Sequence, residues 1–354
     1  MKITIIGNPE NRRVTYFMDA ARRLGVPTPQ VVSWLDCLRH PSPAQICDAD
    51  LIRIDSPGEN FEVEVELVGR GARRQGALPP SWTSETEDRG SIRNQRLWFD
   101  GFKDILDELT QCRGHFMTPP SEILAMFDKI QARERHRNAG APMPGFLGDI
   151  DAMDDLDALA KDHQRMFIKP RFGSSASGVI AFRSRPRRQM TTSVELQGTR
   201  LYNSLKIRTY IEASKQSAII DALAPDGLFA EEWIPKASRG GAFDFRVFVV
   251  AGKAEHTVMR VSQSPLTNLH LGNQRGDIEA FQAAKPCAFR AVQDAAVIAA
   301  SGFSALTCGV DVALEATMKR AYVLETNAFG DLLPNVFIDG KDTYTRSLEE
   351  ALKR

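Results

Sequence analysis

A short apolar strand that runs into a loop of very small residues most constrains the fold of this chain. In the stretch FIKPRFGSSASGV (167–179), the strand ends at Lys169 and Pro170, and the loop from Gly173 to Gly178 carries almost no side chain. Such a loop lets backbone N–H groups approach an anion closely, and the neighbouring lysine adds a positive charge. A second apolar run, GVIAF, follows directly. We therefore expect a hairpin that lies over a ligand bearing a polyphosphate.

The length and charge of the chain restrict its partners. The 354 residues suit two or three packed units. Lysine plus arginine number 45, as do aspartate plus glutamate, so the net charge is zero. No overall field would recruit nucleic acid or a membrane surface. No stretch approaches the roughly 18 uninterrupted apolar residues of a membrane helix, and the first residues do not resemble a signal peptide. These features predict a cytoplasmic protein without nucleic-acid or membrane partners.

The sequence lacks several common site signatures. The five cysteines are odd in number and irregular in spacing, and no CxxC pair occurs, which argues against a disulfide framework and a zinc site. GxSxG, HExxH and the Walker pattern are also missing. Hydrolase, metalloprotease and P-loop chemistry therefore have no support.

The N-terminal third predicts an α/β unit. Residues 2–6 form an apolar run, Asn8 is a possible helix cap before a proline, and a helical pattern continues to Gly25. Apolar runs at 31–36 and 51–55 predict further strands. Because strands and helices alternate, we expect a parallel sheet.

The rest of the chain mixes helices and strands. Residues 68–91 are rich in Gly, Pro, Arg and Ser and predict a long loop or lid. Helical spacing predicts helices over 99–111 and 119–140, and residues 184–228 are expected to be helical in part. Further strands are expected at 228–235, 244–253, 254–262, 305–314 and 320–327, with helices at 289–303 and 347–353.

The last two expected strands carry acidic and amide side chains that would meet. Glu325 and Asn327 share one strand face because side chains alternate, and Asp311 lies on the preceding strand, across a turn near Thr317. Two carboxylates and an amide oxygen suit Mg²⁺, which keeps water and phosphate oxygens as its other ligands. The alternative is that Asp311 and Glu325 pair with nearby arginines.

Other polar groups lie in apolar strands. Arg246 and Arg260 each need an anionic partner, either an acid or a phosphate. The segment AEEWIP (230–235) is either an ordinary strand end or a hinge whose backbone reads an adenine edge. His270 has no acid or serine at a workable spacing, so a positioning or structural role is expected for it.

Read in chain order, these segments resemble the ATP-grasp superfamily. The order is FDK, FIKPRFGSSASG, AEEWI, DFRVFVV, MRV, TNLH, GVDVALE and VLETNAFG, and it covers about residues 119–339. Each motif is weak alone, but their order and spacing make the resemblance specific. The motifs are most similar to those of ligases that attach glutamate to protein or cofactor tails. D-alanine–D-alanine ligases and glutathione synthetases resemble the chain more distantly.

The resemblance implies a fold and a domain division. The fold is α/β, with an α+β nucleotide part. A Rossmann-like N-terminal domain would cover residues 1–118, and an ATP-grasp domain would cover 119–354. The latter would comprise a small lid-bearing subdomain, about 119–230, and a C-terminal subdomain, 231–354.

The resemblance also implies roles for single residues. Arg246 and Arg260 would be catalytic and hold the transferred phosphoryl group and the acyl phosphate. The nucleotide would be bound by two lysines, the small-residue loop, the hinge and one asparagine: Lys129, Lys169, Gly173, Ser174, Ser175, Ser177, Gly178, Glu231, Glu232, Trp233, Ile234 and Asn268. Magnesium would be held by Asp311, Glu325 and Asn327.

The implied function is that of an ADP-forming, ATP-dependent carboxylate–amine ligase. A carboxylate attacks the γ-phosphate to give an acyl phosphate, and an amine then displaces phosphate. ATP and Mg²⁺ are the implied cofactors, with two ions expected and Mn²⁺ as a substitute. The acceptor would be a small molecule or a peptide, and a homodimer is compatible with the resemblance. An ATP-grasp kinase and a non-catalytic ATP-binding regulator are the alternatives, and the metal-ligand set argues against the regulator.

Two departures from the superfamily pattern concern the ribose and the acceptor. Residues 235–238 provide no acid where one often holds the ribose, and the segment after Asn327 differs from that of glutamate ligases. Glutamate specificity is therefore not carried over. Acceptor choice is expected in the N-terminal unit, where ligands bind at strand ends. Candidate residues there, for which surface salt bridges are an equal alternative, are Arg53, Asp55, Glu59, Arg93 and Arg96.

Overall fold

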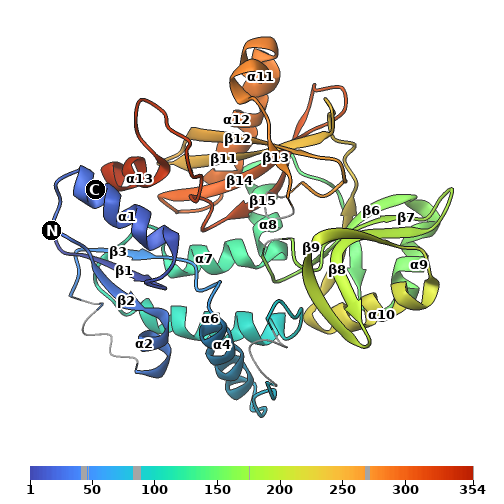
Figure 1. Ribbon diagram of the computed structural model, residues 1–354, viewed down its shortest axis with the longest axis horizontal. Helices are drawn as coiled ribbons and strands as arrows, with labels where there is room; N and C mark the ends of the chain where they lie inside the picture. Colours follow the sequence, from blue (N-terminus) through green and yellow to red (C-terminus); the bar gives the residue numbers. More distant parts are fainter. Residues whose placement is uncertain (41–45, 47, 83–88, 175, 268–271, 354) are drawn as a thin grey trace.

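The computed structural model describes residues 1–40, 46, 48–82, 89–174, 176–267 and 272–353. Within them the strands form three sheets, around which the helices are arranged (Figure 1). The first sheet is parallel, and the other two are antiparallel. The mixed α/β architecture expected from the sequence is confirmed.

The N-terminal sheet has the strand order β2-β1-β3-β4. Its strands are β1 (Ile3–Gly7), β2 (Gln30–Ser33), β3 (Leu51–Ile54) and β4 (His115–Phe116), and its helices are α1 (Arg12–Arg23), α2 (Trp34–Arg39), α4 (Phe61–Arg74) and α6 (Gln95–Leu109). The expected strand at 31–36 ends early, because the Ser33 side chain caps α2 by accepting a hydrogen bond from the Asp36 N–H.

The cap of the first helix differs from the prediction. Asn11, not Asn8, is the N-cap of α1, and its side chain accepts a hydrogen bond from Arg13 N at 2.9 Å. Asn8 instead donates to the carbonyl oxygens of Pro57 and Gly58 at 3.1 and 3.0 Å. It therefore holds the loop that follows β3.

The expectation of a loop from residue 68 onward is wrong for its first part. Helix α4 continues to Arg74 and packs closely against α6. A Cβ atom on Gly71 would lie 1.9 Å from the Leu97 carbonyl oxygen, and one on Gly101 would lie 1.9 Å from the Leu67 carbonyl oxygen. These glycines therefore allow two helices to touch and do not mark a turn.

The second sheet has the order β5-β10-β6-β7-β8-β9. Its elements are β5 (Phe146–Ile150), α9 (Met153–Asp162), β6 (Arg165–Pro170), β7 (Ile180–Arg183), β8 (Gln189–Gln197), β9 (Arg200–Tyr210), α10 (Ala213–Leu223), η1 (Ala224–Asp226) and β10 (Leu228–Glu232). The predicted hairpin is confirmed as β6 and β7, which pair antiparallel on either side of the small-residue loop. Residues 184–228 are helical in part, as expected, through α10 and η1, but they also contain the long strands β8 and β9.

The third sheet has the order β13-β12-β11-β14-β15. Its strands are β11 (Ala242–Val250), β12 (Lys253–Ser262), β13 (Gln274–Arg275), β14 (Thr307–Leu314) and β15 (Ala321–Asn327), and the surrounding helices are α7 (Pro120–Phe127), α8 (Lys129–Ala139), α11 (Ile278–Ala284), α12 (Pro286–Ser301) and α13 (Thr343–Ala351). Apolar residues of β11, β14 and α12, among them Phe245, Val292 and Val310, form the largest core. The helix expected at 119–140 is divided at Asp128, which caps α8.

The ends of the first two sheets can be compared with the predicted domain boundaries. Strand β4 closes the first sheet shortly before residue 118, whereas β10 belongs to the second sheet through Glu232. The boundaries at 118 and 230 remain predictions.

Two further expectations concern cysteines and membranes. Cys37, Cys287 and Cys308 are free, but Cys112 is in a disulfide bond, which the spacing did not predict. None of the helices in the described residues has the length and apolar character needed to cross a membrane.

Candidate active site

A cavity of about 330 Å³ is lined by residues from all three sheets or from the loops that follow their strands. Its size falls in the range of small-molecule sites. Most of the predicted site residues line it: Lys129, Lys169, Gly173, Ser174, Ser177, Glu231, Glu232, Ile234, Arg246, Arg260, Asp311, Glu325 and Asn327. Gly178 and Trp233 are not among the lining residues. Ser175 and Asn268 lie outside the described residues.

The first lysine of the cavity is held by two elements. Lys129 is the first residue of α8, directly after the capping Asp128. Its Nζ donates to the Gly173 carbonyl oxygen at 2.6 Å and lies 3.2 Å from Glu325 Oε1. Lys129 therefore connects the small-residue loop with strand β15.

The second lysine makes a similar connection. Lys169, on β6, lies 2.5 Å from Glu231 Oε1 through its Nζ and donates to the Leu324 carbonyl oxygen at 3.3 Å. Arg133 also binds Glu231, at 2.9 Å from Oε2, so that buried carboxylate has two cationic partners. Two ammonium groups thus reach the cavity from α8 and β6.

Three described residues of the loop between β6 and β7 have a positive φ. Gly173, Ala176 and Gly178 have φ values of +126°, +59° and +75°. Ser177 N donates to the Ser174 carbonyl oxygen at 2.9 Å. Successive residues that change the sign of φ direct N–H groups into a concavity suited to phosphate. Phosphate binding by this loop remains a prediction.

The end of β10 and the residues that follow it border the cavity. Glu232 accepts a hydrogen bond from Gly145 N at 3.0 Å, and Ile234 lines the cavity. Trp233 instead packs against Phe167, with 4.9 Å between ring centroids. Phe167 and Leu324 complete an apolar wall.

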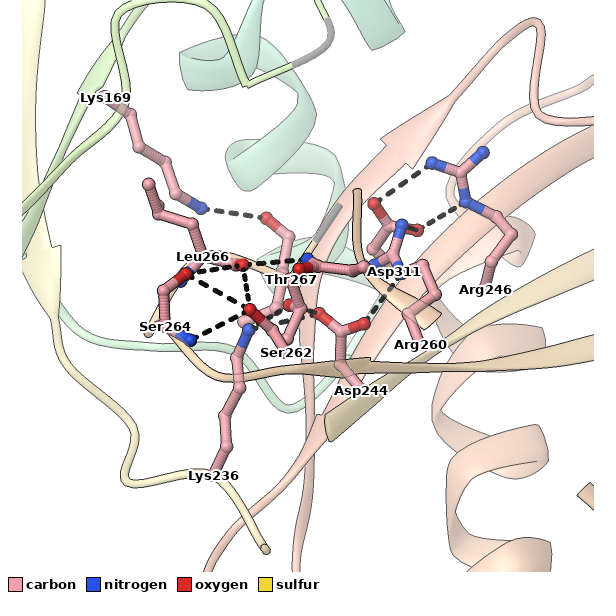
Figure 2. A network of polar contacts seen from close by, with 12 residues as sticks. Lys169, Lys236, Asp244, Arg246, Arg260, Ser262, Ser264, Leu266, Thr267 and Asp311 are labelled. Atoms are coloured by element: carbon pink, nitrogen blue, oxygen red, sulfur yellow. Dashed lines mark hydrogen bonds and ion pairs between the residues drawn. The ribbon is translucent and has the colours of Figure 1, made fainter. Parts of the chain in front are cut away.

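The two predicted arginines are paired with acids of the third sheet (Figure 2). Arg246 binds both carboxylate oxygens of Asp311, with Nη2 at 3.1 Å from Oδ2. Arg260 Nη1 lies 3.2 Å from Asp311 Oδ1, and its Nε donates to Asp244 Oδ1 at 2.7 Å. Burial alone would raise the pKa of Asp311, but the two guanidinium groups outweigh it and lower the pKa to about 2.

Lys236 extends this network and was not predicted as a site residue. Its Nζ lies 3.1 Å from Asp244 Oδ2, and Thr267 bonds to both side chains (Figure 2). Burial lowers the pKa of Lys236, and the negative charge of Asp244 partly opposes this. Lys236 lies in the segment 235–238 after β10, where the sequence provides no acid for the ribose.

A tight turn places Thr267 in the network. Ser262 Oγ and Ser264 Oγ both donate to the Leu266 carbonyl oxygen, at 2.8 and 3.1 Å (Figure 2). Leu266 and Thr267 line the cavity. The serines therefore fix the loop that leads from β12 over the site.

The predicted metal ligands lie on neighbouring strands. Asp311 of β14 is the register partner of Glu325 on β15, and Asn327 lies opposite Gly309. Asp311 is also paired with arginines, as the alternative interpretation held, and Glu325 is near Lys129. Among the described residues, no group of three or more His, Cys, Asp and Glu side chains could hold a metal ion. This donor set fits Mg²⁺ only if phosphate or water oxygens complete its coordination.

The candidate acceptor-binding residues of the N-terminal unit differ in whether they line the cavity. Glu59 lines the cavity, whereas Arg53 and Asp55 are buried and bind each other at 3.0 Å. Arg93 lies over the Trp82 ring at 4.4 Å, and Arg96 is 3.5 Å from Asp100. Neither of these last two arginines is among the cavity residues. Sequence reasoning missed Arg13, which does line the cavity and binds Asp331 at 2.7 Å.

No protein-family model matches the sequence, and no curated protein matches it. Solved structures do match along nearly the whole chain. D-cycloserine synthetase DcsG has a TM-score of 0.59 at 14% identity, covering 99% of this chain and 100% of that one. The ATP-grasp ligase PsnB, complexed with minimal precursor, Mg and ADP, has a TM-score of 0.55 at 15% identity, covering 98% and 96%. The D-alanine–D-alanine ligase from Bacillus anthracis has a TM-score of 0.54 at 11% identity, covering 100% and 96%.

The chain has the ATP-grasp fold. The resemblance predicted from the motifs is thereby confirmed at the level of the fold, including its N-terminal α/β unit. In this chain, residues of the β6–β7 hairpin and of the strand pair β14 and β15 line one cavity. The roles of the individual side chains are taken up next as proposals.

Proposed function

We propose that this protein is an ATP-dependent, ADP-forming ligase that joins a carboxylate to an amine through an acyl phosphate. The observation that carries the proposal is the convergence of lysines, a phosphate-type loop and paired acids in one cavity. The lysines come from α8 and β6, the loop from the β6–β7 hairpin and the acids from β14 and β15. A D-cycloserine synthetase and an ATP-grasp ligase complexed with a precursor peptide share this fold.

In this proposal the second sheet, together with α8 and β15, binds the nucleotide. Lys129 and Lys169 each donate a hydrogen bond to a backbone carbonyl oxygen. With ATP bound they would donate to phosphate oxygens instead, and the N–H groups between Gly173 and Gly178 would cover the phosphates. Phe167 and Leu324 would contact the adenine, whose polar edge would meet the backbone between Glu231 and Ile234.

The third sheet would hold Mg²⁺ through Asp311, Glu325 and Asn327. A bound Mg²⁺ supplies charge neutralisation for the β- and γ-phosphates. Asp311 Oδ2 accepts one hydrogen bond in the described residues, so it keeps a lone pair for a cation. Two ions, with Mn²⁺ as a substitute, belong to the same proposal.

The reaction consists of two displacements. A carboxylate oxygen attacks the γ-phosphorus, and ADP leaves. The amine nitrogen then attacks the acyl carbon, loses a proton, and inorganic phosphate leaves. Arg246 and Arg260 would stabilise the charge that develops on the transferred phosphoryl group, because their fixed guanidinium groups border the same cavity.

Nucleotide binding can be measured by calorimetry with ATP, with and without Mg²⁺. Lys169→Ala should weaken ATP binding about 10- to 100-fold, as expected for a lost hydrogen bond to a charged group. Lys161→Ala, an exposed lysine of α9, is the matched control. Glu325→Gln should reduce the Mg²⁺ dependence of binding, whereas exposed Glu279→Gln should not. Unchanged ATP affinity in Lys169→Ala would show that ATP does not bind at Lys169 and would contradict the proposed nucleotide site.

Turnover distinguishes the ligase from the other ATP-dependent functions. We expect ADP release that requires both a carboxylate and an amine. ADP release with a single substrate and no amine would show a kinase. Tight ATP binding without ADP release in any substrate mixture would show a regulator.

A further inference from the structure

The cavity continues beyond the proposed nucleotide end, toward the N-terminal sheet. There it is lined by a cation, an acid and three aromatic rings: Arg13, Glu59, Trp98, Phe127 and Phe329. None of these residues has a role in the proposed nucleotide or metal site. Their chemistry therefore indicates which kind of substrate the proposed ligase joins.

Arg13 and Glu59 lie on either side of one asparagine. The Asn11 side chain accepts a hydrogen bond from Arg13 N at 2.9 Å and donates to Glu59 Oε2 at 3.0 Å. Arg13 Nη1 binds Asp331 at 2.7 Å, whereas its Nε and Nη2 have no partner within the described part of the chain. Arg13 and Glu59 are not paired with each other, although they carry opposite charges. Glu59 can therefore offer its carboxylate to a ligand, and Arg13 can offer its remaining N–H donors.

Glu59 is held in an unfavourable backbone conformation. Its φ of +70° lies in the left-handed region, which a residue other than glycine adopts at a cost in energy. Asn8 fixes the preceding carbonyls of Pro57 and Gly58, and Asn60 caps α4 directly afterwards. No cation pairs with Glu59 among the described residues. The fold thus places an exposed carboxylate, without a cationic partner in the described ranges, at this end of the cavity.

An aromatic wall stands beside this pair of charges. The Trp98 and Phe127 rings stack with centroids 5.7 Å apart, and Phe127 meets Phe329 edge-on at 5.8 Å. All three residues are half-buried. They come from α6, the end of α7 and the segment after β15. Their exposed ring surfaces offer contact to an apolar or aromatic group.

One short segment connects the wall to both ends of the cavity. Asn327 belongs to the proposed metal ligands, Phe329 to the wall, and Asp331 binds Arg13. Gly330 fixes this segment, because a Cβ atom there would lie 2.3 Å from Gly309 Cα. The segment from Asn327 to Asp331 therefore joins the proposed metal site, the aromatic wall and the partner of Arg13. This is also the segment in which the sequence departs from glutamate ligases.

We propose, on the basis of the ligase function above, that one substrate is a free α-amino acid with a large apolar or aromatic side chain. Its carboxylate would bind Arg13, its ammonium group would bind Glu59, and its side chain would contact the aromatic wall. A residue inside a peptide offers neither charged group next to its side chain. A small polar amino acid would leave the wall without contact.

The substrate class can be tested with phenylalanine and its two truncated analogues. Both enantiomers of phenylalanine, together with 3-phenylpropanoate and phenethylamine, are titrated into the full chain with and without AMP-PNP and Mg²⁺. We expect one enantiomer to bind, and alanine and each analogue to bind at least about tenfold more weakly, because each lacks one contact. Equal binding of phenylalanine and phenethylamine, or no binding of either enantiomer, would overturn the proposal.

Variants test the two contacts separately. Glu59→Gln should weaken phenylalanine binding about tenfold and leave 3-phenylpropanoate unaffected. Glu10→Gln is the matched control, since Glu10 is exposed on the same loop cluster and does not line the cavity. Phe329→Leu should weaken phenylalanine binding but not alanine binding. An equal loss of phenylalanine affinity in the Glu59 and Glu10 variants would contradict the assignment of Glu59 as the ammonium site.

The same titrations separate this inference from the proposed function. If AMP-PNP and Mg²⁺ bind but no amino acid does, the ligase proposal stands and the substrate class is wrong. If phenylalanine binds but AMP-PNP does not, the substrate class stands and the ligase proposal is wrong. Binding of a peptide in place of the free amino acid would assign the same wall to a peptide side chain and overturn the zwitterion site.

Discussion

At the residue scale, charges around the cavity alternate in sign from one side chain to the next. Lys236, Asp244, Arg260, Asp311 and Arg246 form a continuous series in which every buried charge touches an opposite one. Such pairing is what makes burial of charged groups tolerable, because an unpaired charge in the interior costs several kcal/mol. A ligand anion at this site therefore competes with carboxylates for the same guanidinium groups.

One residue-scale prediction concerns pH and His136. This buried histidine bonds Thr326 at 2.7 Å, and burial together with the nearby charges of Arg133 and Lys169 lowers its pKa to about 4. Between the unfolded pKa of 6.5 and the folded value, the unfolded chain binds more protons, so stability falls as pH falls. We expect the wild type to lose about 2 kcal/mol of unfolding free energy between about pH 7 and about pH 5 from this group.

Urea unfolding at the two pH values measures that loss. His136→Gln, whose amide can still bond Thr326, should lose about 2 kcal/mol less than the wild type over the same interval. His115→Gln is the control, because His115 is exposed on β4. Equal pH dependence in the wild type and in His136→Gln would show that this histidine is not held neutral by the fold.

Residues were predictable where local context determines their environment. Lys169 and Gly173 follow from a strand and a small-residue loop, and both line the cavity as expected. Lys236 and Arg13 were missed because their partners, Asp244 and Asp331, reach them only through the folded arrangement of strands and loops. An isolated lysine or arginine in a sequence carries no sign of such a partner.

At the element scale, the capping residue Asp128 determines where α8 begins and thereby the position of Lys129 at the cavity. Apolar spacing continues across residues 119–140 and predicts one helix, yet Asp128 adopts extended backbone and begins a new one. Asp128 Oδ1 accepts hydrogen bonds from Ile130 N and Gln131 N at 3.1 and 3.3 Å, and its carboxylate binds Arg171. Periodicity alone did not reveal the break, because Ala125 and Met126 at the end of α7 and Ala132 of α8 pack in one core cluster.

The cap yields the element-scale prediction. Asp128→Ala should lower the unfolding free energy by about 1–2 kcal/mol, because two N–H groups lose their acceptor. It should also weaken ATP binding, since Lys129 is the first residue of the helix that Asp128 starts. Asp128→Asn keeps an acceptor oxygen and should lose less of both. Calorimetry and urea unfolding of the two variants test this, and equal losses would assign the effect to the charge and not to the cap.

At the scale of the whole molecule, the two ends of the chain share a core. Figure 1 shows α13 beside α1, near both termini. Ile5 and Phe17 of the N-terminal sheet and its first helix pack in one cluster with Tyr344 and Leu348 of α13. The sequence predicted both the first strand and the last helix but gave no sign of their contact, because the pairing of segments more than 300 residues apart depends on the complete fold.

This shared core predicts that the last helix stabilises the first sheet. Leu348 is 0% exposed, and Leu348→Ala should cost about 2–5 kcal/mol in the N-terminal unit. Leu352, at the end of the same helix, is 37% exposed, and Leu352→Ala should cost clearly less. Amide hydrogen exchange resolves the location: exchange should accelerate in β1 and α1 but not in the sheet that contains β6 and β10. Uniform acceleration in all three sheets would mean that the molecule unfolds as one unit, and unchanged exchange in β1 would mean that α13 is not part of its support.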